Sequence, residues 1–215
     1  MKKLPITLKT LPFALPSLLG IVALALLFPT TGALAASHAN TEVEEVGKQP
    51  VQVDFPSGGN LKMDLCSSGV EIIGVDKNRV LVSYDGPKDN SRVKVSLKTS
   101  GSEGTVEVDG CTHDNFRITI EVPRQTHLHV RMAAGELRVE DITGNKDLEL
   151  HAGELNVDLG RAGDYAHVEA SVMTGEVEAA AFDVSKGGFF RSFERKGPGR
   201  YRLHAHVGLG QVTIN

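Results

Sequence analysis

The sequence contains no tryptophan, only three tyrosines and only two cysteines among its 215 residues. The chain therefore has few of the flat side chains on which proteins stack sugars or bases. The common signatures of catalysis are also missing, because we find no Gly-x-Ser-x-Gly, no His-Glu-x-x-His and no glycine-rich phosphate loop. These absences favour a protein that is not an enzyme and that needs no cofactor.

The first 35 residues have the parts of an export signal. They begin with three lysines and no acid, residues 18–28 form an apolar run, and residues 33–35, Ala-Leu-Ala, offer a small-x-small cleavage pattern. The run is shorter than the roughly 20 apolar residues that span a bilayer. We predict a signal peptide over 1–35, no transmembrane span after its cleavage, and a periplasmic or extracellular location. The alternative is an uncleaved membrane anchor.

The remaining chain is acidic. Without the three lysines of the first 35 residues, 20 of the 23 basic side chains remain against 27 acidic ones, which gives a net charge of −7. An acidic chain has little attraction for a polyanion, so we expect no nucleic acid partner.

The two cysteines agree with export. In an exported chain, Cys66 and Cys111 most simply form one disulfide. The loop between them would hold 44 residues, and its closure would stabilise the fold by roughly 4 kcal/mol. The alternatives are two buried thiols or a catalytic thiol near His113, although no recognisable protease context surrounds Cys111.

A short pattern recurs four times in the second half of the chain. It consists of a glycine, Glu or Gln, and two apolar residues separated by one polar residue, and it begins at Gly135, Gly153, Gly175 and Gly210. The intervals are 18, 22 and 35 residues, so the last one has room for an extra turn. Periods near 20 predict stacked supersecondary units.

Apolar and polar residues alternate before and after each glycine, as they do in strands. No window after the export signal shows a helical period. We therefore predict an all-β fold, a single-domain β-solenoid of short stacked strands over 51–215, with a glycine at each corner. Residues 36–50 are acidic and poor in apolar side chains, which predicts a flexible leader.

Three stretches resemble one bacterial family. They are residues 118–123 (Ile-Thr-Ile-Glu-Val-Pro), 127–130 (His-Leu-His-Val) and 134–139 (Ala-Gly-Glu-Leu-Arg-Val), which are similar to the bacterial putative-adhesin domain of unknown function, also called the toastrack β-solenoid. The likeness extends over nearly all of 51–215. The resemblance implies an exported, repetitive β fold and carries over no catalytic residue, and the adhesin label suggests binding by analogy.

The strands before the glycines place many histidines on their outward face. Six of the eight histidines fall there, interspersed with acids. Neighbouring strands lie about 4.8 Å apart, so His127, His129, His204 and His206 are candidate ligands for a divalent metal such as Zn²⁺ or Cu²⁺. The alternative is a solvated face on which histidines pair with acids.

The repeat position after each glycine is a candidate cation site. Glu136, Glu154, Glu176 and Gln211 share one repeat position, and a stack of like charges there could bind Ca²⁺ or be screened by Arg138 and solvent.

Residues 186–202 are basic and rich in aromatics. They could touch an anionic lipid headgroup or a surface polymer. Alternatively, they form a long hairpin that closes the solenoid with its aromatics buried.

These features favour an exported, non-enzymatic, adhesin-like binding or scaffold module at the cell envelope. Its expected partner is an envelope protein or a surface polymer. The alternative is a carbohydrate-active enzyme on a β-solenoid scaffold, which would use acids of the histidine-rich face such as Glu149 and Glu169.

Overall fold

The structure, a computed structural model, describes residues 40–86, 91–111 and 115–215. Residues 37–215 form one compact unit. The hydrophobic core of the described residues lies within it, so residues 37–215 have a core of their own. The expected signal peptide, residues 1–35, lies outside the described residues. In the described part of the chain, no helix is long and apolar enough to cross a membrane.

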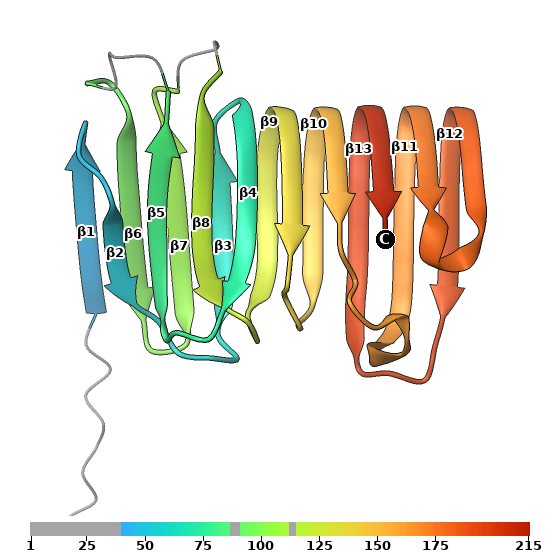
Figure 1. Cartoon of the computed structure of the whole chain (residues 1–215), viewed down its shortest axis with the longest axis horizontal. Helices are drawn as coiled ribbons and strands as arrows, with labels where there is room; N and C mark the ends of the chain where they lie inside the picture. The colour runs from blue at the N-terminus through green and yellow to red at the C-terminus, as the bar shows by residue number, and fades with distance from the viewer. Residues whose placement is uncertain (1–39, 87–90, 112–114) are drawn as a thin grey trace, which may run out of the picture. The chain divides into compact units, whose positions relative to one another are not determined.

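The all-β prediction is confirmed, because the described chain folds into one 13-stranded sheet (Figure 1). Eight short strands come first: β1 (Asn40–Val46), β2 (Val51–Asp54), β3 (Asn60–Leu65), β4 (Ser68–Val75), β5 (Arg79–Asp85), β6 (Lys94–Ser100), β7 (Glu103–Asp109) and β8 (Arg117–Pro123). Five longer strands follow: β9 (His127–Glu140), β10 (Lys146–Val157), β11 (Tyr165–Ala179), β12 (Val184–Lys196) and β13 (Tyr201–Ile214). The short 3-10 turns Ala162–Asp164 and Ala180–Phe182 flank β11.

The sheet doubles back on itself, so that it forms two facing layers (Figure 1). The first half of β9 pairs with β3, and that layer continues through β7 and β6 to β1. The second half of β9 pairs with β4, and that layer continues through β8 and β5 to β2. The core lies between the layers, where Leu128 and Val130 come from one half of β9 and Leu137 and Val139 from the other.

Each long strand in the parallel part of the sheet turns from one layer to the other at a glycine. In β9, the last buried residue before the turn is Met132 and the next is Leu137. Residues five apart in a flat strand point to opposite faces, so both can be buried only if the chain folds over between them. Sequence alternation predicts a strand on each side of the glycine, and the structure joins the two halves into one bent strand.

The bend requires glycine for two reasons. Gly153 has φ of +131°, a conformation that residues with a Cβ rarely adopt. A Cβ placed on Gly153 would also lie 1.9 Å from the carbonyl oxygen of Gly135 in the neighbouring strand. The same close approach recurs from strand to strand, with Gly210 against Gly153 and Gly175 against Gly210.

The glycine-marked strands lie side by side in register, but not in chain order. Their order is β9-β10-β13-β11, and all contacts among them are parallel. The last repeat, β13, lies between the second and the third. The long final interval of the sequence contains β12, which pairs antiparallel with the edge of β11 that faces away from β13. After β12 the chain returns, and β13 pairs parallel with the other edge of β11.

The predicted flexible leader is wrong over residues 40–46, which form β1. This strand pairs antiparallel with β6 along its whole length. Glu44 lies 2.9 Å from Lys94, and Glu42 lies 3.1 Å from Lys98. An acidic, apolar-poor segment is therefore ordered here by main-chain pairing and by opposite charges on the neighbouring strand.

The predicted disulfide is present between Cys66 and Cys111. Their Cα atoms lie 6.0 Å apart, within the usual range for a bridge. Cys66 follows β3 and Cys111 follows β7, and these two strands are parallel neighbours. The disulfide therefore ties together the ends of two adjacent strands.

Candidate functional site

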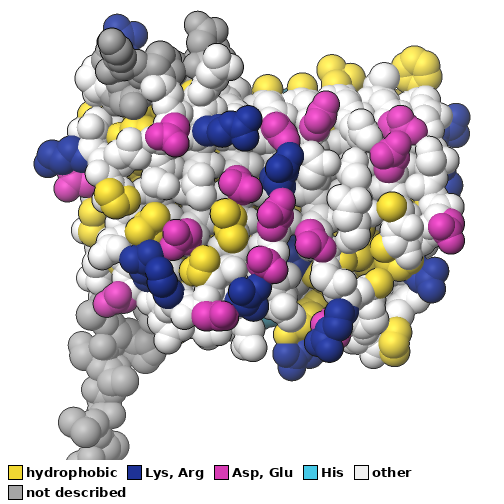
Figure 2. All heavy atoms as spheres, in the orientation of Figure 1, with side chains coloured by type: hydrophobic (Ala, Val, Ile, Leu, Met, Phe, Trp, Pro, Cys, Tyr) yellow, Lys and Arg dark blue, Asp and Glu magenta, His cyan; other side chains and the backbone are white. Residues whose placement is uncertain are grey.

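The outward face of the first halves of β9, β10, β13 and β11 carries a set of polar side chains that we call the ladder surface. The face seen in Figure 2, on the side where the C-terminal end of β13 lies, shows Lys, Arg, Asp and Glu interspersed and hardly any histidine. The histidines gather instead on the ladder surface, which consists of His127, His129, Arg131, Asp147, Glu149, His151, His167, Glu169, Ser171, Arg202, His204 and His206.

The central row of the ladder surface is bridged by one carboxylate. The register places Asp147 of β10 between His129 of β9 and His204 of β13. The Nδ1 atoms of both imidazoles lie 2.7 Å from Asp147, one at each carboxylate oxygen. Since a carboxylate only accepts, both Nδ1–H groups donate, which leaves Nε2 of each ring for a further contact.

Burial alone would raise the pKa of the Asp147 carboxyl. The hydrogen bonds from His204 and His129 outweigh this effect, so the pKa lies below its usual value of 3.8. Asp147 therefore stays ionised over a wide pH range. Three strands are linked by charge-assisted hydrogen bonds at this row.

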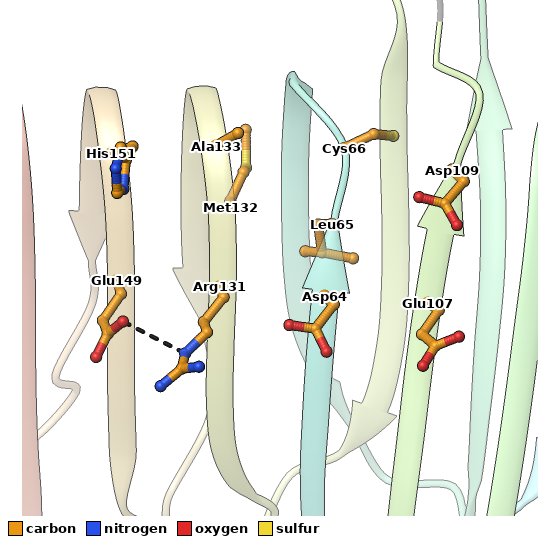
Figure 3. Close-up of a pocket in the computed structure, with 10 residues that line it drawn as sticks. All are labelled: Asp64, Leu65, Cys66, Glu107, Asp109, Arg131, Met132, Ala133, Glu149 and His151. Carbon is orange, nitrogen blue, oxygen red and sulfur yellow. Dashed lines mark ion pairs between the residues drawn. The ribbon is translucent and has the colours of Figure 1, made fainter.

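The next row contains two separate pairs. Arg131 Nε lies 3.3 Å from a carboxylate oxygen of Glu149, as Figure 3 shows. On the adjoining strands, His206 Nδ1 and the Ser171 hydroxyl share a hydrogen bond of 2.9 Å. The four side chains come from four neighbouring strands, and each contacts the strand beside it.

Two further histidines of the ladder surface, His127 and His167, also have polar neighbours. The backbone N–H of Asn145 donates to Nδ1 of His127 at 2.9 Å. His167 lies 3.6 Å from Glu169 on the same strand and 3.7 Å from Glu194 on β12.

The four candidate metal ligands therefore occupy three rows. His129 and His204 share the Asp147 row, whereas His127 lies in the row before it and His206 in the row after it. Among the described residues, no group of three or more His, Cys, Asp or Glu side chains is arranged to hold a metal ion. Histidine–acid pairing, the alternative interpretation, describes His129, His204 and His167, and the metal site stays a prediction.

A shallow depression of about 600 Å³ adjoins the ladder surface (Figure 3). Its charged lining combines Asp64 of β3, Glu107 and Asp109 of β7, Arg131 of β9, and Glu149 and His151 of β10. Asp64 and Glu107 are opposite each other on adjacent strands. Lys62 lies 3.1 Å from Asp64, so the acids are only partly compensated.

The sequence repeats gave no indication of this depression, because three of its four acids lie on β3 and β7, which precede the first repeat. The alternating pattern of these strands could have shown that Asp64 and Glu107 face outward. It could not have shown that parallel pairing brings them beside Arg131.

The expected stack of glutamates is present, with one change in order. The sequence of residues across the strands is Glu136, Glu154, Gln211 and Glu176. The neutral Gln211 therefore separates two of the acids, and Arg138 lies 2.8 Å from Glu136. This arrangement relieves part of the like-charge repulsion, while Glu136 and Glu154 remain opposite each other.

Among the described residues, one charged side chain lies inside the core, and it was not among the predicted site residues. Lys146 begins β10 in the inward register and is 2% exposed. Its Nζ donates to the Ile142 carbonyl oxygen at 2.7 Å and to the Tyr165 hydroxyl. The alternation of β10 was the available signal, since it points Asp147 outward and therefore Lys146 inward.

Comparison with known proteins gives a likeness of fold. No family model matches the sequence, and no curated protein matches it. The fold is similar to the crystal structure of a putative cell adhesion protein from Clostridium sporogenes, with a TM-score of 0.50 and 12% sequence identity. The match covers 82% of this chain and 99% of that one. At this identity the likeness concerns the fold alone.

Proposed function

We propose that the chain is an exported, non-enzymatic, adhesin-like binding or scaffold module of the cell envelope, with the ladder surface and its depression as the contact region. The observation that carries this proposal is the bridging of strands by outward side chains, above all His129, Asp147 and His204. Side chains that are already held in place lose little freedom when a partner binds.

Two further observations support this function. The structure with a similar fold is that of a protein described as a putative cell adhesion protein. The disulfide between Cys66 and Cys111 fits an oxidising compartment, the periplasm or the cell exterior.

The charges of the contact region indicate the chemistry of its partner. The depression has four carboxylates against one arginine and one histidine. We therefore expect a neutral or cationic partner, either a basic segment of an envelope protein or a surface polymer with amino and hydroxyl groups. A polyanion would be repelled.

The surroundings of Glu149 suit binding. Glu149 and Glu169 lie on β10 and β11, with β13 between these strands. Glu149 also faces Arg131 at 3.3 Å, which suits an anchored recognition group.

A binding and turnover assay tests the proposal. Residues 37–215 are incubated with isolated envelope polysaccharides, with co-sedimentation and the release of reducing ends as the two measurements. We expect co-sedimentation without release, and weaker co-sedimentation for the double variant Asp64→Asn with Glu107→Gln. The matched control is Asp54→Asn with Glu103→Gln, which removes two exposed acids outside the depression.

Two results would contradict the proposal. One is the release of reducing ends that disappears in Glu149→Ala or Glu169→Ala, since this would establish the enzyme. The other is binding that the two double variants weaken equally, since the depression would then have no special role.

A further inference from the structure

Four large apolar side chains are exposed where β11, β12 and β13 lie together. Met173 is 50% exposed, Phe189 is 70%, Phe190 is 79% and Leu209 is 58%. The register places Thr174, the residue after Met173, opposite both Leu209 and Phe189. The four side chains therefore form one group, which we call the apolar ridge. Grouped exposure of this kind marks contact surfaces on soluble domains.

The backbone at Phe190 adds a second sign of function. Its φ is +51°, in the left-handed region that bulky side chains rarely adopt. A strained residue costs free energy that the rest of the fold must offset. The most exposed side chain of the ridge is thus held in an unfavourable conformation, where β12 pairs with the bend of β11 and Gly188 lies opposite Gly175.

Basic side chains accompany the ridge along β12. The strand carries Lys186, Arg191, Arg195 and Lys196 against the single acid Glu194. Arg191 donates to the Gly187 carbonyl oxygen at 2.9 Å, and Lys186 donates to the Ser192 carbonyl oxygen at 3.1 Å. Arg195 lies over the Phe182 ring, 4.9 Å from its centre. Among the ion pairs of the described residues, none involves these four cations.

The place of β12 leaves this surface open. β12 is the last strand in the order of the sheet and pairs only with β11 (Figure 1). The sequence allowed either exposed aromatics or buried ones over residues 186–202, and each alternative holds for part of this segment. Phe193 and Tyr201 are buried, whereas Phe189 and Phe190 are exposed.

We propose that the apolar ridge and the cations of β12 dock this chain on an anionic lipid bilayer. The phenylalanines enter the boundary between headgroups and acyl chains, while the cations contact phosphate oxygens at the surface. A soluble polyanion would engage the cations but would leave the apolar ridge in water. The lipid contact is separate from the ladder surface and does not depend on it.

Vesicle binding tests the apolar part of the contact. Residues 37–215 are sedimented with vesicles of phosphatidylcholine alone and with vesicles that contain one-third phosphatidylglycerol. We expect binding to the second kind only, and the double variant Phe189→Ser with Phe190→Ser lowers the partition coefficient at least about tenfold. Val46→Ser, which removes an exposed apolar side chain from β1 at the other end of the sheet order, leaves binding unchanged.

Charge reversal tests the electrostatic part. The variant Arg191→Glu with Arg195→Glu should also weaken binding at least about tenfold, because each cation near an anionic surface contributes about fivefold. Lys48→Glu with Lys77→Glu alters the net charge equally at exposed sites outside β12 and should retain most of the binding. Unchanged melting temperatures show that the variants are folded.

Three outcomes overturn the proposal. The first is that the wild-type protein fails to bind the anionic vesicles. The second is that dextran sulfate binds the protein and the phenylalanine variant does not weaken vesicle binding, which would assign the cations to a soluble polyanion. The third is self-association without lipid that the phenylalanine variant abolishes, which would assign the ridge to a second copy of the chain.

Discussion

The charge of Lys146 should make the stability of the fold depend on pH in the alkaline range. Burial lowers the pKa of this lysine from 10.5 to about 8, although the carboxylate of Asp158 offsets part of the effect. The ammonium is held by the Ile142 carbonyl oxygen and the Tyr165 hydroxyl, and it lies 4.9 Å from the centre of the Tyr165 ring. These contacts are fewer than water would provide.

The direction and size of the effect follow from the two pKa values. Between pH 8 and pH 10.5 the unfolded chain holds a proton that the folded chain has released, so the free energy of unfolding rises with pH in this window. A difference of about 2.5 pKa units corresponds to about 3.4 kcal/mol. This penalty is nearly complete at neutral pH. It falls by about 2 kcal/mol when the pH is raised from about 7 to about 9.5.

Urea unfolding of residues 37–215 at several pH values measures this change. We expect the free energy of unfolding to rise toward alkaline pH in the wild type and to stay nearly flat in Lys146→Met, which keeps the apolar stem. At neutral pH the two proteins should be similarly stable, because Lys146→Met also leaves Ile142 O and the Tyr165 hydroxyl without their partner, at about 1–3 kcal/mol each. Lys62→Met, at a half-exposed lysine, is the control and should retain the rise.

A wild type whose stability is constant or falls over this range would refute the reasoning. A Lys146→Met variant that keeps the full rise would refute it equally, because the titrating group would then lie elsewhere. A shift of both proteins by the same amount points to the general charge of the chain, which Lys62→Met would also report.

Two other predictions concern the bends and the bridged row. Gly153→Ala should destabilise the fold by about 3 kcal/mol or more, because φ is +131° and the new Cβ would meet the Gly135 carbonyl oxygen. Gly163 has open space around it, so Gly163→Ala is the control and should change the free energy of unfolding in urea little. The lowered pKa of Asp147 stabilises the fold above its unfolded pKa, and this contribution is lost as the pH falls through the folded pKa. Asp147→Asn should therefore remove about 1 kcal/mol or less of stability at neutral pH and reduce the loss on acidification below about pH 4. Equal acid sensitivity in Asp147→Asn and in the exposed control Asp54→Asn would argue against the bridge.

The repeat pattern predicted the in-register strands because the bend itself requires a glycine, and this requirement is visible in the sequence. Only glycine accepts the φ of the bend and the close approach of the neighbouring carbonyl, so each bend leaves a visible mark. Alternation likewise predicted the buried side chains on both sides of Gly153, from Leu150 to Leu155, since a buried face selects apolar residues at every second position.

The sequence could not predict features that depend on which strands are neighbours. The depression forms because β3 lies between β7 and β9, and the acids of β1 are compensated because β6 is its neighbour. These are contacts between residues far apart in the chain, and no local pattern encodes them. The exposure of Phe189 and Phe190 could not be predicted for a related reason. An aromatic run has the same sequence pattern whether its strand lies in the centre of a sheet or at its edge.

The order of the long strands nevertheless has a reason that can be read from side chains. If β11 lay directly beside β10 with the glycines in register, Glu169 would adjoin Asp147 and Glu176 would adjoin Glu154. Like charges directly opposite on neighbouring strands are unfavourable. With β13 in between, His204 stands next to Asp147 and donates to it at 2.7 Å, and Gln211 separates the two glutamates. The last repeat therefore has His204 and Gln211 at the positions where β11 has Glu169 and Glu176. These two residues make β13 suitable for the place between β10 and β11.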